Sequence, residues 1–183
     1  MVGEGKERVC PVSLHKSFDN KLRKLIHNPK KILKDYIKEG DTAIDFGCGP
    51  GFFTLTMAEL AGSRGKVIAA DLQQGMLDIV ESKIRNTNLR IQLHKTEQQK
   101  TGITEKADFI LLFYTVHELP DQQNFFMQMK QITKPSGKIL IVEPPFHVNE
   151  KAFRKTLKKA RQAGFTEHPG PKMLLSRTAV LAN

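Results

Sequence analysis

The chain has 183 residues but only two cysteines, Cys10 and Cys48, which lie far apart in the sequence. Two thiols are too few for a disulfide framework or a structural zinc site, and this length can bury a core without either. No apolar stretch approaches the length of a membrane-spanning helix. The opening segment MVGEGKERVC also lacks the apolar part of a signal peptide. We therefore expect a protein of the reducing cytoplasm, with no membrane span and no bound metal.

Acidic residues are also few relative to basic ones. The chain has 29 Lys and Arg against 19 Asp and Glu, a formal net charge of +10. Such a balance attracts anions, among them nucleic acid, acidic membrane and phosphorylated small molecules. Aromatic residues do not interleave the basic ones, as platforms for base stacking would require. A solvated basic surface is therefore the favoured interpretation, and a nucleic-acid partner is the alternative.

Short apolar runs alternate with segments of helical spacing along most of the chain. The expected strands are 42–46, 66–70, 90–94, 108–113 and 138–143, and the expected helices include 52–61, 74–85 and 121–133, the last followed by a turn at Pro135-Ser136-Gly137. A helix stopped by Gly40 is expected before the first strand. This alternation, with short joints, implies right-handed crossovers and a doubly wound, mostly parallel sheet of an α/β protein.

The C-terminal part of the sequence breaks this alternation. The expected helix 149–163 is followed by a short strand, a Pro/Gly turn at 169–171 and a last strand at 176–181. Strands so close in sequence pair as an antiparallel hairpin, because a parallel return needs a crossover. We thus expect seven strands in one domain at 28–183, preceded by an arm or cap helix at 1–27.

The stretch AIDFGCGPG, residues 43–51, places three glycines where the first strand ends. Ligands of open parallel sheets bind at the carboxyl ends of the strands. Gly47 and Gly49 lack a Cβ, so the backbone can touch a ligand there, and Gly51 lets the next helix begin close to the sheet. Dinucleotide sites usually have G-x-G-x-x-G, with a pyrophosphate against a helix N-terminus. The G-x-G-x-G spacing found here is different.

Two acids flank this glycine loop. Asp45, two residues before the first glycine, would repel a pyrophosphate but could hold a cationic ligand, directly or through water. Asp71 ends the second strand, 20 residues after Gly51, and can accept hydrogen bonds from both hydroxyls of a ribose. The pair favours a positively charged nucleoside over a dinucleotide.

Four segments in register resemble motifs of the class I S-adenosylmethionine-dependent methyltransferases. They are AIDFGCGPGFF, IAADLQQGML, ADFILLFYTVHELPD and GKILIVEP. The order and spacing hold from about residue 28 to the C-terminus, and the antiparallel last strand also matches. The chain is most similar to the small group resembling ubiquinone- and menaquinone-biosynthesis methyltransferases. The resemblance implies a Rossmann-like methyltransferase fold that binds S-adenosyl-L-methionine and releases S-adenosyl-L-homocysteine.

The resemblance also implies which residues contact the cofactor. Residues of the glycine loop would line its methionine and ribose parts: Gly47, Cys48, Gly49 and Gly51. Asp45 would orient the amino group and Asp71 the ribose. The remaining contacts would come from Leu72 and Met76 at the adenine, Thr96 and Glu97 near the adenine amino group, and Phe113 and Tyr114 at the methionine end. In HKTEQQ, Thr96 and Glu97 stand where the family usually has an acid and a small residue.

No sharp catalytic signature is present, which methyl transfer does not require, because positioning can supply much of the rate enhancement. The first candidate for a general base is His117, in TVHELPD, because an imidazole titrates near neutrality. Glu118 is the second candidate and stands where a common family variant has a second histidine. His147 could also face the pocket, and His15 and Asp19 could close it from the N-terminal arm.

The favoured function is methyl transfer to a small-molecule acceptor by a monomer or homodimer. One alternative is a nucleic-acid methyltransferase that uses the basic face of helix 149–163. Another is a regulator that binds S-adenosylmethionine without catalysis. A nicotinamide-dependent dehydrogenase is disfavoured by the glycine spacing.

Overall fold

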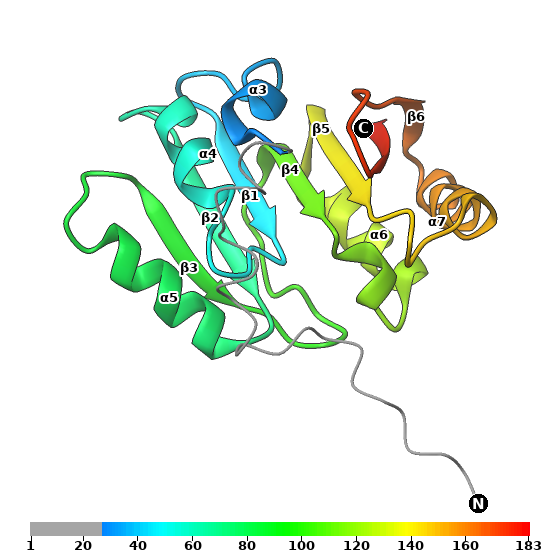
Figure 1. Ribbon diagram of the computed structural model, residues 1–183, viewed down its shortest axis with the longest axis horizontal. Coiled ribbons are helices and arrows are strands. Elements are labelled where there is room, and N and C mark those ends of the chain that lie inside the picture. The colour runs from blue at the N-terminus through cyan, green and yellow to red at the C-terminus, as the bar shows by residue number, and fades with distance from the viewer. Residues whose placement is uncertain (1–26) are drawn as a thin grey trace, which may run out of the picture.

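The computed structural model describes residues 27–183, which form one seven-stranded sheet with helices on both faces (Figure 1). The strands lie in the order β3-β2-β1-β4-β5-β7-β6. Strands β1 to β5 are parallel, and β7 runs antiparallel to both β5 and β6. The doubly wound sheet and the C-terminal hairpin are thereby confirmed.

The elements follow one another as the alternation predicted. The strands are β1 (Thr42–Phe46), β2 (Lys66–Asp71), β3 (Ile91–Lys95), β4 (Ala107–Phe113), β5 (Thr133–Glu143), β6 (Thr166–Pro169) and β7 (Arg177–Ala182). The helices are α3 (Pro29–Leu33), α4 (Thr54–Ala61), α5 (Gln74–Ile84), the 3₁₀ turn η2 (Val116–Glu118), α6 (Gln122–Ile132) and α7 (Glu150–Gln162). The helix expected before Gly40 is short and ends at Leu33, with a turn after it.

The expected turn at Pro135-Ser136-Gly137 is wrong, because these residues belong to β5. Thr133 pairs with Ala107, but the next pair is Lys138 with Phe109, so the ladder shifts register here. Proline has no N–H for a ladder and is tolerated at such irregularities. A Cβ on Gly137 would lie 2.8 Å from the Ala107 carbonyl oxygen, so only glycine allows β4 to approach this closely. The Pro-Ser-Gly segment therefore forms a bulge in β5 and not a chain reversal.

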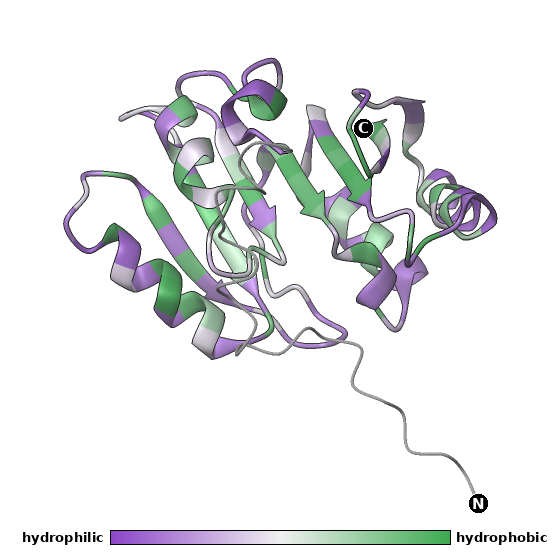
Figure 2. Cartoon of the chain, viewed as in Figure 1, coloured by the Kyte–Doolittle hydropathy of each residue, from purple (hydrophilic) through white to green (hydrophobic). Residues whose placement is uncertain are grey.

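Strand β4 is buried on both faces, and its side chains alternate between two cores. Phe109 and Leu111 join α3 and α4 in one cluster, whereas Ile110 and Leu112 join α6 and α7 in the other. Figure 2 shows the hydrophobic residues concentrated in the central strands and on the inner sides of the helices. This pattern explains why β4 reads as an unbroken apolar run in the sequence.

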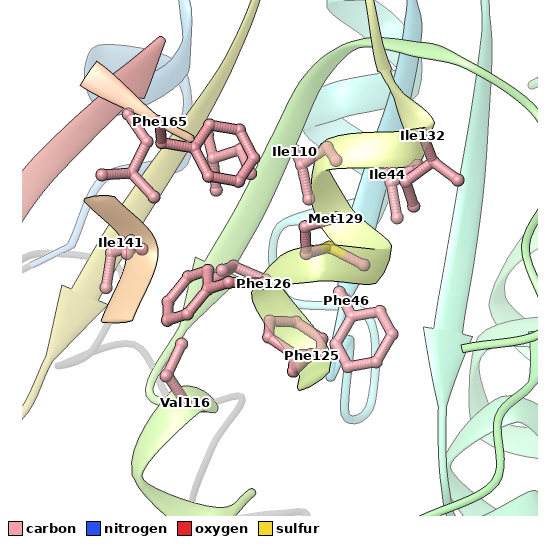
Figure 3. Close-up of a cluster of buried hydrophobic side chains, with 14 of the residues drawn as sticks. Ile44, Phe46, Ile110, Val116, Phe125, Phe126, Met129, Ile132, Ile141 and Phe165 are labelled. Carbon is pink, nitrogen blue, oxygen red and sulfur yellow. The ribbon is translucent and has the colours of Figure 1, made fainter. Parts of the chain in front are cut away.

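Helix α6 anchors the second of these cores. Phe126 and Met129 are fully buried and lie near Ile110 and Ile141 of the sheet (Figure 3). Complete burial of such a side chain stabilises the fold by about 1.5–3 kcal/mol. Asp121 caps the start of the helix, because its carboxylate accepts a hydrogen bond from Asn124 N at 3.0 Å. The packing fixes the segment 114–121, which joins β4 to α6 beside the carboxyl edge of the sheet.

Five parallel strands end together at this edge, at Phe46, Asp71, Lys95, Phe113 and Glu143. Strand β7 begins there, because Arg177 is opposite Glu143 in the antiparallel ladder. Within residues 27–183, no helix combines the length and the apolar character needed to cross a bilayer.

Candidate active site

A cavity of about 520 Å³ opens at the carboxyl edge of the sheet, within the usual range for small-molecule sites, roughly 300–1,000 Å³. Its walls come from the loops that follow the first five strands, within the ranges 45–53, 71–76, 96–101, 113–128 and 144–147. All but one of the cofactor residues proposed from the sequence line it, as do both proposed catalytic residues. The topology therefore brings to one place residues as far apart in the sequence as Asp45 and His147.

The exception is Gly51, which was expected to line the cavity and does not. Its φ of +81° is in the left-handed region, and a Cβ there would lie 3.0 Å from Val80 Cγ2 of α5. Its role is thus to make the turn and the close packing behind the loop. Gly49, with φ +52°, would direct a Cβ into open space beside the cavity, so at this position the missing side chain leaves the backbone accessible to a ligand.

Gly47 is needed for a third reason, which concerns the loop after β4. Its φ is +72°, and a Cβ would lie 2.5 Å from Thr115 Oγ1. That hydroxyl donates to the carbonyl oxygens of Phe46 and Phe113, both at 3.2 Å, and so joins the ends of β1 and β4. Nothing in the sequence distinguishes Thr115, and sequence reasoning missed it.

Replacing Gly47 with alanine is expected to lower the free energy of unfolding by about 3 kcal/mol, because left-handed strain and overpacking add. Gly40→Ala is the matched control, since Gly40 also has a positive φ, +94°, but has nothing within 4 Å of an added Cβ. Gly40→Ala should lower the free energy of unfolding by the left-handed backbone strain alone, about 1–2 kcal/mol. Urea unfolding of both variants measures the difference. Equal losses of unfolding free energy in the two variants would show that the Thr115 side chain moves aside without cost.

The carboxylate of Asp71 is turned toward the glycine loop. Its two oxygens accept from Gly49 N and Gln73 N, both at 2.9 Å. Burial raises the pKa of Asp71, and the hydrogen bonds from the backbone N–H groups of Gln73, Gly49 and Leu72 oppose that rise. The side chain therefore connects the loop after β1 to the end of β2, and it lines the cavity.

The other acid of the pair, Asp45, is only 2% exposed. One of its oxygens accepts from Thr54 Oγ1 at 2.6 Å, across the start of α4. Thr54 was missed by sequence reasoning. Burial first, and then the charges of Asp45 and Asp71, raise the pKa of Cys48 well above its usual value. Position 48 is therefore a neutral thiol near two acids.

The residues expected to contact the cofactor after β3 and β4 line another part of the cavity wall. Thr96 is buried, and its N donates to the Asp71 carbonyl oxygen at 2.9 Å, which continues the sheet past β3. Glu97 lines the same wall. Tyr114 has a left-handed backbone, φ +60°, and its hydroxyl donates to Leu175 O at 3.1 Å. The loop before β7 therefore rests against the cavity wall.

His117 is held by a carboxylate from the next strand. Its Nδ1 lies 2.5 Å from Glu143 Oε2, and Glu143 Oε1 accepts from Val116 N at 2.9 Å. Glu143 is only 1% exposed. Burial lowers the pKa of His117, but the hydrogen bond and charge of Glu143, with the charge of Glu118, raise it above its ordinary value. The ring centroid of His147 lies 5.7 Å from that of His117, and both line the cavity.

Glu143 was not among the residues selected from the sequence, although a signal was there. It ends a buried strand in GKILIVEP, as Asp71 ends VIAAD. An acid at the carboxyl end of a parallel strand faces the ligand edge. His15 and Asp19 lie outside the described residues. Within residues 27–183, no group of three or more His, Cys, Asp and Glu side chains could hold a metal ion.

Glu118 is the second acid near His117, and its environment disfavours its charge. Burial raises its pKa to about 7; the charge of His117 lowers it, and those of Asp71 and Glu143 raise it. The folded state therefore holds the carboxyl proton of Glu118 more tightly than the unfolded chain does. The contribution of this group to the stability of the fold is complete below about pH 4.5 and is lost as the pH rises through about 7.

Glu118→Gln should therefore stabilise the protein at pH 8 and change little at pH 5. With allowance for the partial exposure of the side chain, we expect a gain of about 1–2 kcal/mol. This corresponds to a rise in Tm of about 3–6 °C. Thermal unfolding at both pH values, with Glu97→Gln as the control, measures the effect. A gain that is the same at pH 5 and pH 8 would contradict the raised pKa of Glu118.

The chain matches the family model described as a methyltransferase domain over residues 37–169. It is 34% identical to a demethylmenaquinone methyltransferase of Lactobacillus johnsonii over 118 residues, which are 62% of this chain and 48% of that protein. Another match, the demethylmenaquinone methyltransferase of Bacillus cereus, is 27% identical over 58% of this chain and 46% of that protein. The chain thus spans about half the length of the curated relatives it matches.

Solved structures agree with the fold over nearly the whole chain. A SAM-dependent methyltransferase from Aquifex aeolicus superimposes with a TM-score of 0.83 and 26% identity, covering 94% of this chain and 97% of that one. A putative S-adenosyl-L-methionine-dependent methyltransferase from Methanococcus maripaludis has a TM-score of 0.76 at 18% identity, covering 100% and 97%, and supports the fold alone.

The residues of the cavity suit the cofactor of these proteins. S-adenosylmethionine combines a ribose, an adenine and two positive charges, at its sulfur and its amino group. The cavity offers an open backbone at Gly49, the fixed acids Asp45 and Asp71, and apolar walls. By its family match and by its fold, the chain belongs to the methyltransferase domain family and is a class I, S-adenosylmethionine-binding member of it.

Proposed function

We propose that this protein transfers the methyl group of S-adenosylmethionine to a small-molecule acceptor, with His117 as the general base. The observation that carries the proposal is that His117, held by the buried Glu143, lines the same cavity as Asp71 and Gly49. One pair supplies a proton acceptor, and the other supplies a seat for a nucleoside. The acceptor would bind between them, on the side of His117 and His147.

The proposal also assigns a role to each cofactor residue. Asp71 would accept hydrogen bonds from the ribose, and Asp45 would orient the amino group, directly or through water. The adenine would lie against Leu72 and Met76, with its amino group near Thr96 and Glu97. The methionine end would pass Gly47, Cys48 and Gly49 toward Phe113 and Tyr114. Each of these residues lines the cavity, which is what supports the assignment.

S-adenosylmethionine supplies a methyl group that is already activated by its bond to a positively charged sulfur. In the proposed reaction, a lone pair of the acceptor forms the bond to the methyl carbon, and the electrons of the carbon–sulfur bond remain on sulfur as S-adenosylhomocysteine leaves. The proton lost by the acceptor goes to Nε2 of His117. Glu143 fixes the Nδ1–H tautomer, so Nε2 is the free base. Alignment of the two reactants could lower the barrier by about 7–11 kcal/mol.

The acceptor side of the cavity has apolar side chains beside its polar ones. Its lining includes Leu119, Phe125 and Pro144, next to the polar His117 and His147. This combination favours a flat, apolar ring that carries an acidic O–H or C–H group. The relatives from Lactobacillus johnsonii and Bacillus cereus are named for demethylmenaquinone. We infer an acceptor of that chemical class.

The proposal is tested by calorimetry and by transfer of a labelled methyl group. S-adenosylhomocysteine should bind and NADH should not. Label from S-adenosylmethionine should then enter a quinone-type ring from a panel of acceptors. Cofactor binding without turnover on any acceptor would indicate a regulator. Label in bulk RNA, with none in the small molecules, would indicate a nucleic-acid methyltransferase.

The proposal includes a cytoplasmic location and a monomer or homodimer. Cys48 is free and buried, in keeping with a reducing setting. The division at residue 27, with an arm or cap before the domain, stays a prediction.

A further inference from the structure

Three exposed apolar side chains lie on loops beside the cavity. Phe146, 79% exposed, lies between Pro144 and His147, which both line the cavity. Leu174 and Leu175, 67% and 46% exposed, lie on the loop before β7. We refer to Phe146, Leu174 and Leu175 as the apolar rim. Of the four large hydrophobic residues exposed in the described part of the chain, only Met127 is outside this rim.

The two loops of the apolar rim are joined by Arg177. Its Nε donates to Val148 O at 2.9 Å, and its Nη1 donates to Glu150 Oε2 at 2.7 Å. Arg177 is two residues from Leu175, and Val148 is two residues from Phe146. The Tyr114 hydroxyl also holds the Leu175 carbonyl oxygen against the cavity wall. The rim is therefore a fixed part of the surface at the entrance.

Basic side chains continue this surface along α7. The helix begins three residues after His147 and buries Phe153, Leu157 and Ala160 against the sheet. Its opposite side is a shallow groove lined by Glu150, Lys151, Arg154, Lys155, Lys158 and Arg161. Figure 2 shows this outer side of α7 as hydrophilic. Lys172, also exposed, lies two residues from Leu174 on the rim loop. An apolar entrance thus adjoins a cationic face.

We propose that the apolar rim and the basic face of α7 dock on an anionic phospholipid bilayer. Exposed apolar side chains enter the boundary between headgroups and acyl chains, and lysines nearby are attracted to the negative surface. Aliphatic Leu174 and Leu175 gain from acyl chains but cannot stack on bases, which favours a bilayer over RNA. If the proposed function holds, the cavity would open toward the membrane, and a lipophilic acceptor could enter without crossing water.

The chain contains no tryptophan, so a single Phe146→Trp substitution provides a specific fluorescent reporter. Its emission should shift to shorter wavelength with vesicles of phosphatidylcholine and phosphatidylglycerol. Brominated acyl chains should quench it, and 0.5 M salt should reverse both effects. Met127→Trp, at the exposed apolar residue of α6 that lies outside the rim, is the control and should not respond. Equal responses of the two reporters, or no response from Phe146→Trp, would overturn the proposal.

Two loss variants separate the apolar and the electrostatic contributions. F146S/L174S/L175S and K151E/K155E should each sediment with anionic vesicles roughly tenfold less than the unsubstituted protein. The control K34E/K38E changes exposed lysines before β1, away from the carboxyl edge, and should keep binding. Unchanged sedimentation of both loss variants would refute docking by this surface, and binding of RNA in place of vesicles would assign it to nucleic acid.

Calorimetry with S-adenosylhomocysteine on the same variants keeps this proposal distinct from the proposed function. Cofactor binding should be retained in all of them, because none of the substituted residues lines the cavity. Vesicle binding without methyl transfer would leave docking intact and remove the proposed activity. Methyl transfer without vesicle binding would leave the proposed activity intact and remove docking.

Discussion

Replacing Asp71 with alanine is expected to weaken the binding of S-adenosylmethionine and S-adenosylhomocysteine by about 100-fold or more. The substitution removes the acceptor proposed for the ribose hydroxyls, and a hydrogen bond to a charged group contributes about 1.5–3 kcal/mol. It also leaves Gly49 N and Gln73 N without the carboxylate that holds them. The loop after β1 would then lose its connection to β2. Isothermal titration calorimetry measures the change in Kd for both ligands.

The matched control is Asp78→Ala, which removes an exposed carboxylate on α5 that accepts from Gln74. It should bind both ligands as the unsubstituted protein does. Asp71→Asn provides a second comparison, because its amide keeps the shape but presents N–H groups to one of the two backbone donors. It should resemble alanine more than aspartate. A Kd for Asp71→Ala within threefold of the original would refute the proposed role.

Substitution of His117 by alanine is expected to lower kcat by roughly 10²–10⁴-fold, the usual contribution of a positioned general base. The Kd for S-adenosylmethionine should change little, because His117 is placed on the acceptor side. Stopped-time assays with labelled methyl groups measure the rate, and calorimetry measures the binding. Equal loss of both would show that His117 only supports the fold of the cavity.

Glu143→Gln distinguishes a base held by a carboxylate from a histidine that merely packs. The charge and hydrogen bond of Glu143 raise the pKa of His117, opposing the effect of burial. Without that charge the pKa falls, so the neutral base persists to lower pH and the acid limb of the kcat profile shifts downward. The plateau should also fall, because the tautomer is no longer fixed. An unmoved limb with a lower plateau would indicate a structural role alone.

Much of the fold could be predicted because its signals are local. Each glycine of 47–51 has a positive φ or a close contact of its own, and the strands are apolar runs that need no distant partner to be recognised. The acid at the end of β2 was found for the same reason. The expectation of a turn at 135–137 was wrong because a bulge uses the same residue types as a turn.

The rest of the site depends on strand register, which the sequence does not display. His117 and Glu143 are 26 residues apart and meet because β4 and β5 are neighbours that end at the same edge. Thr115 lies 69 positions from the Phe46 carbonyl oxygen that it binds. No sequence spacing is typical of such pairs. His117 could therefore be proposed from the sequence, but its partner Glu143 could not.

The contact between Gly47 and Thr115 predicts how these two positions vary among related proteins. The threonine occupies the volume that any side chain at 47 would need, so the two residues cannot enlarge independently. Relatives with alanine or serine at position 47 should have glycine or alanine at position 115. Shortening residue 115 first and then enlarging residue 47 should be tolerated more readily than the opposite order. The packing between the ends of β1 and β4 would thereby limit which residues can occur at these two positions, independently of any ligand.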